Sequence, residues 1–236
     1  MSTHLVGASG IDWNQFEGVI FDVDGTLFDH RAMRPSIAAA FLRHVLTERH
    51  GLRDLFVVLV FRRVRTRLAR AEAAEIGRTE FATAARITRV SVTEVEEIVA
   101  RWIYQKPLSI IHRHAFPGAD AFVAALKKRG FRTGVFSDYP AEDKLRALGL
   151  SMDIVRDATS ADVRCLKPNP AGFLKVAELL GIPPARCLII GDRDDRDGEA
   201  AKRGGFAYLK KTSGGRRPAQ YQFSDYHDLV NELASS

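Results

Sequence analysis

The alternation of hydrophobic and polar positions divides the chain into strand-forming and helix-forming stretches. Residues 19–21 are a short apolar run that stops at acidic residues, as expected of a buried strand that meets a polar loop. Residues 132–136 and 187–190 repeat this pattern, and each run is followed within two residues by an aspartate. We therefore predict buried strands with acidic residues at their carboxyl ends.

Residues 35–101 differ, because they are rich in Ala, Leu, Arg and Glu and contain no strand pattern bounded by turns. Gly51 and Gly77 are predicted helix ends, and residues 91–94 (SVTE) form a predicted capping box that opens a helix through Trp102. We expect the apolar run at residues 55–61 to be buried among these helices. A face that contacts a membrane surface or a partner is the alternative.

From residue 116 onward, strands and helices alternate with short connections. Helices are predicted at residues 120–129, 142–148, 170–180, before residue 200 and at 229–233, and strands at 132–136, 154–155, 187–190 and 207–209. This alternation predicts a doubly wound parallel sheet of the Rossmann-like α/β class, with about eighty residues of helix inserted after its first strand.

The composition indicates the class of protein and its compartment. The 236 residues are 46% hydrophobic and 27% charged, which is ordinary for a globular protein. Cys165 and Cys187 form no disulfide framework or metal-binding pattern, which fits a reducing compartment. Residues 1–10 lack a signal-peptide pattern, and no apolar run reaches about 18 residues. We therefore expect a cytoplasmic protein with no transmembrane segment.

The net charge of +6 and the isoelectric point near 9.5 favour anionic partners. Much of the basic character lies in residues 43–70, where the only acidic residues are Glu48 and Asp54. The arginines of this segment are Arg43, Arg49, Arg53, Arg62, Arg63, Arg65, Arg67 and Arg70. We expect most of these arginines to form a solvated helix face. The alternatives are an anionic substrate pocket and attraction to nucleotides or acidic lipid headgroups.

Polar side chains follow the predicted strands at the points where they end. Residues i and i+2 of a strand point to the same side, so Asp22 and Asp24 are expected to converge. Ser137 and Asp138 follow the second strand, and Asp192 follows the run at residues 187–190. Because ligands of parallel sheets bind beyond the carboxyl ends of the strands, these residues predict one shared site.

A crevice with several carboxylates suits Mg²⁺, which binds hard oxygen ligands. In such a site Asp22 is a candidate to attack phosphorus and form an aspartyl-phosphate, and Asp24 is a candidate to protonate the leaving oxygen. Thr26, Ser137 and Lys167 are candidates to hold the phosphate oxygens, because phosphoryl transfer depends mainly on electrostatic stabilisation. The residues therefore point to hydrolysis of a phosphate monoester.

Four stretches resemble, in order, the motifs of the haloacid dehalogenase (HAD) superfamily in its phosphatase form. They are residues 22–26 (DVDGT), residues 135–138 (VFSD), Lys167-Pro168, and residues 189–192 (IIGD) with Asp197. The resemblance implies that Asp22 is the nucleophile and that Asp24 is the general acid and base. It also implies that Asp22, the Asp24 backbone carbonyl, Asp192 and Asp197 hold the Mg²⁺ ion.

Two positions depart from the usual motifs. The commoner three-residue gap in the fourth motif would reach Arg196, but residues 197–201 (DGEAA) fit the Asp-x-x-Ala-Ala helix of the superfamily, which favours Asp197. Asp194 and Asp195 stay candidates for the same role. Asp138 stands where Asn is common, and it is either an additional contact to the substrate phosphate or an acidic turn residue.

The resemblance implies that residues 30–115 form an all-α cap domain and that residues 1–29 and 116–236 form the catalytic core. A mobile cap would close over the site and supply the contacts that select the substrate. We expect that substrate to be a small phosphorylated metabolite. No nucleic-acid partner is expected, because a basic chain without aromatic stacking motifs is a weak signal for one.

Three alternatives stay open. A phosphomutase would differ only in its products. A 2-haloacid dehalogenase needs neither a metal nor a second acid, so Asp24 and the acidic fourth motif argue against it. A non-catalytic member could bind a polyanion through the basic cap, but the complete acidic set argues against lost catalysis.

Overall fold

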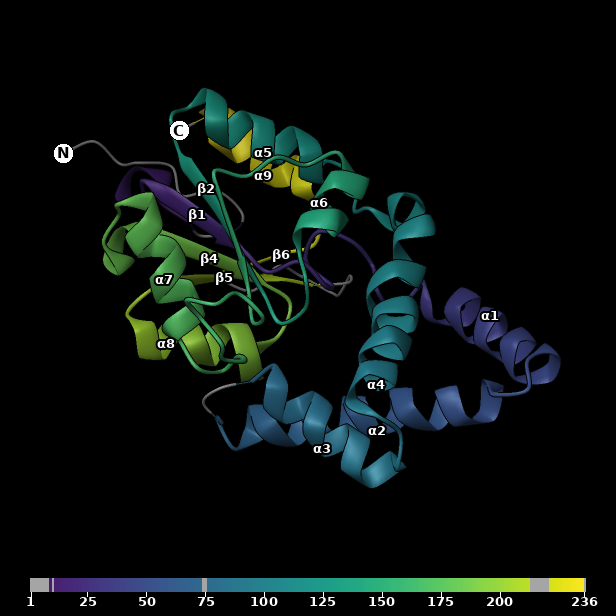
Figure 1. Ribbon diagram of the computed structural model, residues 1–236. Helices are drawn as coiled ribbons and strands as arrows, with labels where there is room; N and C mark the ends of the chain where they lie inside the picture. Colours follow the sequence, from purple (N-terminus) through teal and green to yellow (C-terminus); the bar gives the residue numbers. More distant parts are fainter. Residues whose placement is uncertain (1–8, 10, 74–75, 213–220, 236) are drawn as a thin grey trace.

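A six-stranded parallel sheet forms the centre of the larger part of the molecule, as the computed structural model shows (Figure 1). The structure describes residues 9, 11–73, 76–212 and 221–235. Residues 1–8, 10, 213–220 and 236 of the predicted core and residues 74–75 of the predicted cap therefore lie outside the described residues. The strands are β1 (Gly18–Phe21), β2 (Arg132–Ser137), β3 (Ile154–Asp157), β4 (Cys187–Gly191), β5 (Ala207–Lys211) and β6 (Gln222–Phe223). Their order in the sheet is β3-β2-β1-β4-β5-β6, which confirms the predicted Rossmann-like parallel sheet.

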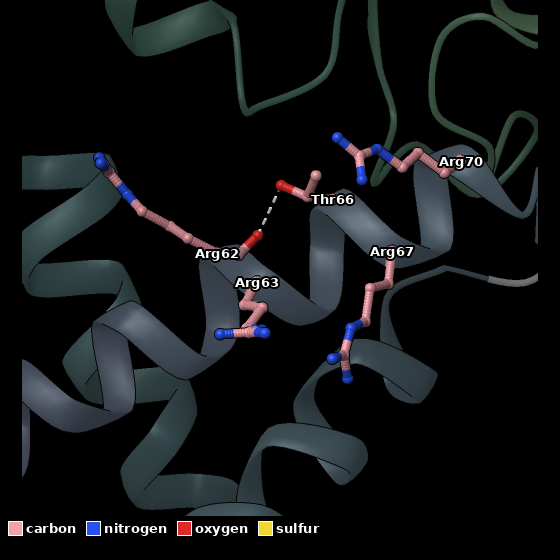
Figure 2. A pocket seen from close by; sticks show the side chains of 5 residues that line it. All are labelled: Arg62, Arg63, Thr66, Arg67 and Arg70. Carbon is pink, nitrogen blue, oxygen red and sulfur yellow. Dashed lines mark hydrogen bonds between the residues drawn. The ribbon is translucent and has the colours of Figure 1, made fainter.

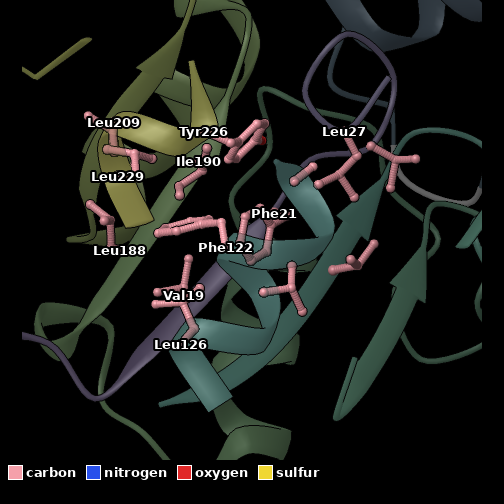
Figure 3. Close-up of a cluster of buried hydrophobic side chains, with 14 of the residues drawn as sticks. Val19, Phe21, Leu27, Phe122, Leu126, Leu188, Ile190, Leu209, Tyr226 and Leu229 are labelled. Atoms are coloured by element: carbon pink, nitrogen blue, oxygen red, sulfur yellow. The ribbon is translucent and has the colours of Figure 1, made fainter. Parts of the chain in front are cut away.

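The sheet has a hydrophobic cluster on each face, because side chains of a strand alternate between faces. Val19 and Phe21 of β1 lie in one cluster, under helices α5 (Ala119–Lys128) and α9 (Tyr226–Ser235) (Figure 3). Ile20 lies in the other, with residues of α7 (Ala171–Leu180) and α8 (Glu199–Gly204). Strand β1 is therefore fully buried, and the loop that follows it is held between β2 and β4.

Helices α1 (Arg34–Thr47), α2 (Gly51–Arg70), α3 (Arg78–Thr88) and α4 (Val92–Val99) form a separate group beside the sheet (Figure 1). They pack around a hydrophobic cluster of their own, which includes Phe41 stacked on Trp102 with the ring centroids 3.9 Å apart. Ser91 and Glu94 form the predicted capping box. The cap at residues 30–115 stays a prediction, which this separate cluster supports.

Shorter helical segments complete the described chain. The helical path after α4 continues through Ala100–Gln105, Lys106–Ser109 and Ile111–His114, so it extends past the predicted end at Trp102. The others are Trp13–Gln15, α6 (Glu142–Leu148), Pro184–Arg186 and Asp194–Gly198. Cys165 and Cys187 are both buried and unpaired. Within the described ranges, no helix combines the length and the hydrophobicity needed to cross a bilayer.

The expected burial of the apolar run at residues 55–61 is wrong for two of its members. Val57, Val58 and Phe61 are buried in the cap cluster, but Phe56 is 50% exposed and Leu59 is 57% exposed. The run is apolar on every side of α2, whereas neighbouring helices cover only part of its circumference. Its remaining side therefore carries large apolar side chains into solvent.

Candidate active site

Asp22 lies directly after β1, at the middle of the sheet edge. Its backbone N–H donates to the Ile190 carbonyl oxygen at 2.8 Å, and Thr26 Oγ1 donates to Asp22 Oδ2 at 3.1 Å. Asp22 is only 4% exposed and Thr26 is fully buried. The Tyr226 hydroxyl donates to the Thr26 carbonyl oxygen at 2.9 Å, so α9 helps to fix the turn that carries these residues. Asp22 therefore has a defined position with little freedom.

Lys167 brings the third motif to the first and the fourth. Its ammonium contacts Asp22 Oδ1 and lies 2.7 Å from Asp197 Oδ1, and all three side chains are buried. Burial alone would lower the pKa of Lys167, but the carboxylates of Asp197, Asp22 and Asp138 raise it. Lys167 is therefore a permanent positive charge at the centre of the site.

Asp22, Asp192 and Asp197 offer carboxylate oxygens that all lie within 4.8 Å of one another. Burial raises the pKa of Asp22 to about 7, with Asp197 and Asp24 adding to the effect and Lys167 opposing it. Burial and the Asp22 charge raise the pKa of Asp192 to about 6. Burial also raises the pKa of Asp197. One lysine therefore leaves these acids short of positive charge, which is the condition that a divalent cation relieves.

Two glycines allow the acidic side chains to approach so closely. A Cβ atom at Gly25, whose φ is +99°, would lie 2.5 Å from Asp192 Oδ2. A Cβ atom at Gly191 would lie 2.4 Å from Asp197 Cγ. The donor set consists of carboxylate oxygens, which are the ligands that Mg²⁺ prefers. The residues present therefore fit a hard divalent cation, with Asp22, Asp192 and Asp197 as the candidate side-chain ligands.

The structure separates the three aspartates of the fourth motif. Asp197 is 1% exposed, and besides Lys167 it accepts a hydrogen bond from the Arg193 backbone N–H at 3.1 Å. Asp194 and Asp195 are exposed and pair with Lys210 and Arg193, respectively. Of the three candidates, the structure therefore brings only Asp197 into the acidic cluster.

The second motif, at residues 137–138, forms hydrogen bonds with neighbouring loops. Ser137 is fully buried at the end of β2, and its Oγ accepts from the Tyr139 backbone N–H at 3.3 Å. Asp138 accepts from the Lys167 backbone N–H at 3.0 Å and from Arg196 Nη1 at 2.8 Å. Asp138 thus joins the loops of the last three motifs, and its contact with a substrate phosphate stays a prediction.

Lys144 is a site residue that the sequence reasoning missed. It lies on α6, its side chain is 6% exposed, and its ammonium forms an ion pair with Asp24 Oδ2. The ammonium also lies 5.5 Å from the centroid of the Tyr139 ring. Nothing in the motif spacing distinguishes this lysine from other helical lysines.

Arg65 of α2 was also missed as a site residue, because it is one of eight arginines in its segment. Its guanidinium contacts Glu80 within the cap and donates to the Asp138 carbonyl oxygen. Its Cζ atom lies 4.6 Å from the centroid of the Tyr139 ring. Arg65 therefore connects the predicted cap to the loop after β2.

A hollow of about 250 Å³ opens against the acidic cluster. It is lined by Gly25, Asp29, His30, Arg31, Phe116, Asp192, Lys210, Lys211 and Thr212. Asp192 therefore borders a space that a small ligand or ion can reach. A larger hollow lies elsewhere, along α2.

Comparison with known proteins places these features in a group of enzymes. A family model of haloacid dehalogenase-like hydrolases matches residues 16–205. The chain is 32% identical over 188 residues to a phosphoglycolate phosphatase from Rhodospirillum rubrum, covering 75% of this chain and 71% of that protein. It is 29% identical over 196 residues to an N-acetylmuramic acid 6-phosphate phosphatase from Pseudomonas aeruginosa, covering 81% and 79%. The crystal structure of a 2-haloacid dehalogenase from Pseudomonas syringae matches with a TM-score of 0.63 at 20% identity, covering 93% and 98%, which shows a shared fold.

Proposed function

The chain belongs to the haloacid dehalogenase-like hydrolase family, and we propose that it is a Mg²⁺-dependent phosphatase that uses an aspartyl-phosphate on Asp22. Its substrate is a small organic phosphate monoester. The names of the phosphatase relatives support the substrate class, since they include phosphorylated glycolate and a phosphorylated amino sugar acid. The observation that carries the proposal is the buried cluster of Asp22, Asp192 and Asp197 around Lys167.

In the first half-reaction, a carboxylate oxygen of Asp22 forms a bond to phosphorus while the bond from phosphorus to the ester oxygen breaks. Asp24 gives its proton to that leaving oxygen, and the alcohol departs. In the second half-reaction, Asp24 takes a proton from water, whose oxygen attacks phosphorus as the bond to Asp22 breaks. The products are an alcohol and inorganic phosphate, and both aspartates return to their starting states.

Other residues hold the phosphoryl group during these steps. The Lys167 ammonium is charged and lies at Asp22, so it is placed to neutralise oxygens of a phosphoryl group bound there. Thr26 hydrogen-bonds Asp22 Oδ2 and orients the carboxylate for attack. Ser137 is proposed to donate to a phosphoryl oxygen, and Asp138 to add a contact at the same group.

Asp22, Asp192, Asp197 and the Asp24 backbone carbonyl are proposed to hold Mg²⁺. When bound, Mg²⁺ supplies positive charge that stabilises the transferred phosphoryl group. The raised pKa values of Asp22 and Asp192 support a cation at this position, because a nearby positive charge favours their ionised forms.

The fold alone does not distinguish a phosphatase from a dehalogenase, since a dehalogenase shares it. Asp24 and the Asp192–Asp197 pair favour the phosphatase, because attack on a carbon–halogen bond needs neither a metal nor a second acid. A phosphomutase would form the same aspartyl-phosphate and return a phosphorylated isomer. Product analysis therefore separates these reactions.

The test is release of inorganic phosphate from a panel that includes 2-phosphoglycolate, sugar phosphates and nucleotides, with Mg²⁺ and with a chelator. We expect release that requires Mg²⁺ and that falls at least about a thousandfold in Asp22→Asn. Asp195→Asn is the matched control, because this exposed aspartate pairs with Arg193 at the surface, and it should keep activity. Chloroacetate turnover in the presence of chelator, or full activity in Asp22→Asn, would overturn the proposal.

A further inference from the structure

The net positive charge of the chain comes from residues 30–115. This segment contains 16 lysines and arginines against eight aspartates and glutamates, whereas the rest of the chain contains 19 against 21. Arg65 reaches the loop of the second motif and Arg31 lines the hollow beside Asp192, so the active site accounts for only part of this imbalance. The remaining basic residues therefore invite a separate explanation.

Helix α2 carries one solvent-exposed stripe along its whole length. The exposed residues recur every three or four positions, which places them on one helix face. On this face they are Leu52, Phe56, Leu59, Arg63, Thr66, Arg67 and Arg70, and the exposed Arg62 borders it. The opposite side packs into the cap through Val57, Phe61 and Val64. At 20 residues, the stripe extends over about 30 Å.

The C-terminal half of the stripe is cationic and unpaired. Arg62, Arg63, Thr66, Arg67 and Arg70 line a shallow hollow of about 490 Å³ (Figure 2). The guanidinium groups spread away from one another, and the one hydrogen bond drawn joins Thr66 Oγ1 to the Arg62 carbonyl oxygen at 2.9 Å. None of these arginines pairs with an acidic group in the described part of the chain, unlike Arg53 and Arg65 on the same helix. These charges are therefore available to an external anion.

The N-terminal half of the stripe is apolar. Leu52 is 71% exposed, Phe56 is 50% exposed and Leu59 is 57% exposed. The neighbouring helix α1 adds Leu42, which is 60% exposed, and Leu46, which is 75% exposed. These five are the most exposed large hydrophobic residues in the described ranges. The hairpin of α1 and α2 extends away from the sheet, so no part of the core covers its far end (Figure 1). Exposure of these apolar side chains to water is unfavourable, and contact with another apolar surface would relieve it.

We propose that this stripe, with Leu42 and Leu46, docks on the surface of an anionic phospholipid bilayer. The leucines and Phe56 enter the boundary between headgroups and acyl chains, and the arginines bind headgroup phosphates. A helix with apolar side chains and a cluster of four basic residues has the composition that such surfaces attract. The proposal concerns peripheral contact and does not depend on which phosphate ester the active site hydrolyses.

Two other occupants fit these observations less well. A nucleic acid would engage the arginines, but it offers nothing for five exposed leucine and phenylalanine side chains. A second copy of the chain would cover the apolar half, but it would bring two strongly basic caps together. Only an anionic surface with an apolar interior matches both halves.

The experiment is co-sedimentation of the full chain with phosphatidylcholine vesicles that contain phosphatidylserine, compared with pure phosphatidylcholine vesicles. We expect binding to the anionic vesicles only, and its loss in about 0.5 M sodium chloride, which screens the charges. Arg63→Glu/Arg67→Glu and Phe56→Ser/Leu59→Ser should each weaken binding at least about tenfold. Arg78→Glu/Arg86→Glu on α3 is the matched control, because it reverses two exposed arginines outside the stripe and should bind like the natural chain.

Release of phosphate from a soluble substrate checks that the variants are folded, and it should be unchanged in all of them. Failure to bind anionic vesicles would overturn the proposal, whatever the catalytic result. Equal binding by the stripe variants and the control would overturn it as well. Oligonucleotide binding that survives Phe56→Ser/Leu59→Ser without vesicle binding would assign the stripe to nucleic acid. A dimer in light scattering that this variant dissociates, again without vesicle binding, would assign it to a second copy.

Discussion

The Lys144 ammonium forms an ion pair with the carboxylate of Asp24, and the Lys144 side chain is almost fully buried beside it. Asp24 itself is 29% exposed, so Lys144 is the fixed member of the pair. The contact joins α6 to the loop after β1. It holds the carboxylate of the proposed general acid and base in one position.

Replacement of this lysine should therefore slow the reaction without weakening substrate binding. We expect Lys144→Met to lower kcat about tenfold to a hundredfold, because a general acid that loses its orientation loses much of its contribution. KM should change little, since Lys144 does not contact the proposed phosphate site. Steady-state kinetics on the best substrate measure both constants. A change confined to KM would instead place Lys144 in the substrate pocket.

The fourth motif supplies a second prediction, on metal dependence. Asp197→Asn should raise the Mg²⁺ concentration needed for half-maximal activity by at least about tenfold, because it removes a ligand charge and a partner of Lys167. Asp194→Asn and Asp195→Asn should leave this concentration within about twofold, since both residues lie at the surface. Mg²⁺ titrations of phosphate release compare the three variants. Equal effects would mean that Asp197 holds no metal.

A third prediction concerns stability and pH without divalent cations. Burial raises the pKa of Asp22 from its ordinary 3.8 to about 7, so the folded protein holds this proton more tightly than the unfolded chain does. The resulting stability is present at low pH and is lost as the pH rises through about 7. Melting temperatures in chelator should therefore fall between about pH 4 and pH 7 and level off above pH 7, with a smaller fall in Asp22→Asn. Added Mg²⁺ should raise the melting temperature most at pH 8, where the carboxylates are ionised.

A fourth prediction compares two glycines with similar backbone angles. Gly25 and Gly130 have φ values of +99° and +85°, but a Cβ atom at Gly130 would meet nothing within 4 Å. Gly130→Ala should cost about 1 to 2 kcal/mol of unfolding free energy through backbone strain alone. Gly25→Ala should cost more and should reduce kcat/KM at least about a hundredfold, because its Cβ displaces Asp192. Urea unfolding and kinetics of both variants provide the comparison.

Sequence patterns were sufficient for the sheet and for the aspartates at its edge, because both follow from local rules. Apolar runs predict buried parallel strands, and the parallel arrangement brings their carboxyl ends together. The same rules predict one shared site for Asp22 and Asp192, whose carboxylate oxygens lie within 4.8 Å of each other in the structure. Asp197 followed from the Asp-x-x-Ala-Ala pattern, and its burial agrees with that choice.

Local sequence rules do not predict which helical side chains contact the loops of the site. Lys144 and Arg65 reach the site because α6 and α2 pack against the loops after β1 and β2, and packing of this kind has no signature in residue spacing. The exposure of Phe56 and Leu59 was missed for a related reason. A continuous apolar run does not indicate which sides of its helix are covered by neighbouring helices.

Arg65 has a consequence for the proposed motion of the predicted cap. Its guanidinium is 4% exposed in terms of side-chain area, and it touches Glu80 on one side and the Asp138–Tyr139 segment on the other. In the proposed opening, the predicted cap cannot separate from this segment without admitting water to that guanidinium. The proposed opening and the hydration of this arginine would then be one event, and its rate can be followed at Arg65 by spectroscopy of a labelled guanidinium nitrogen.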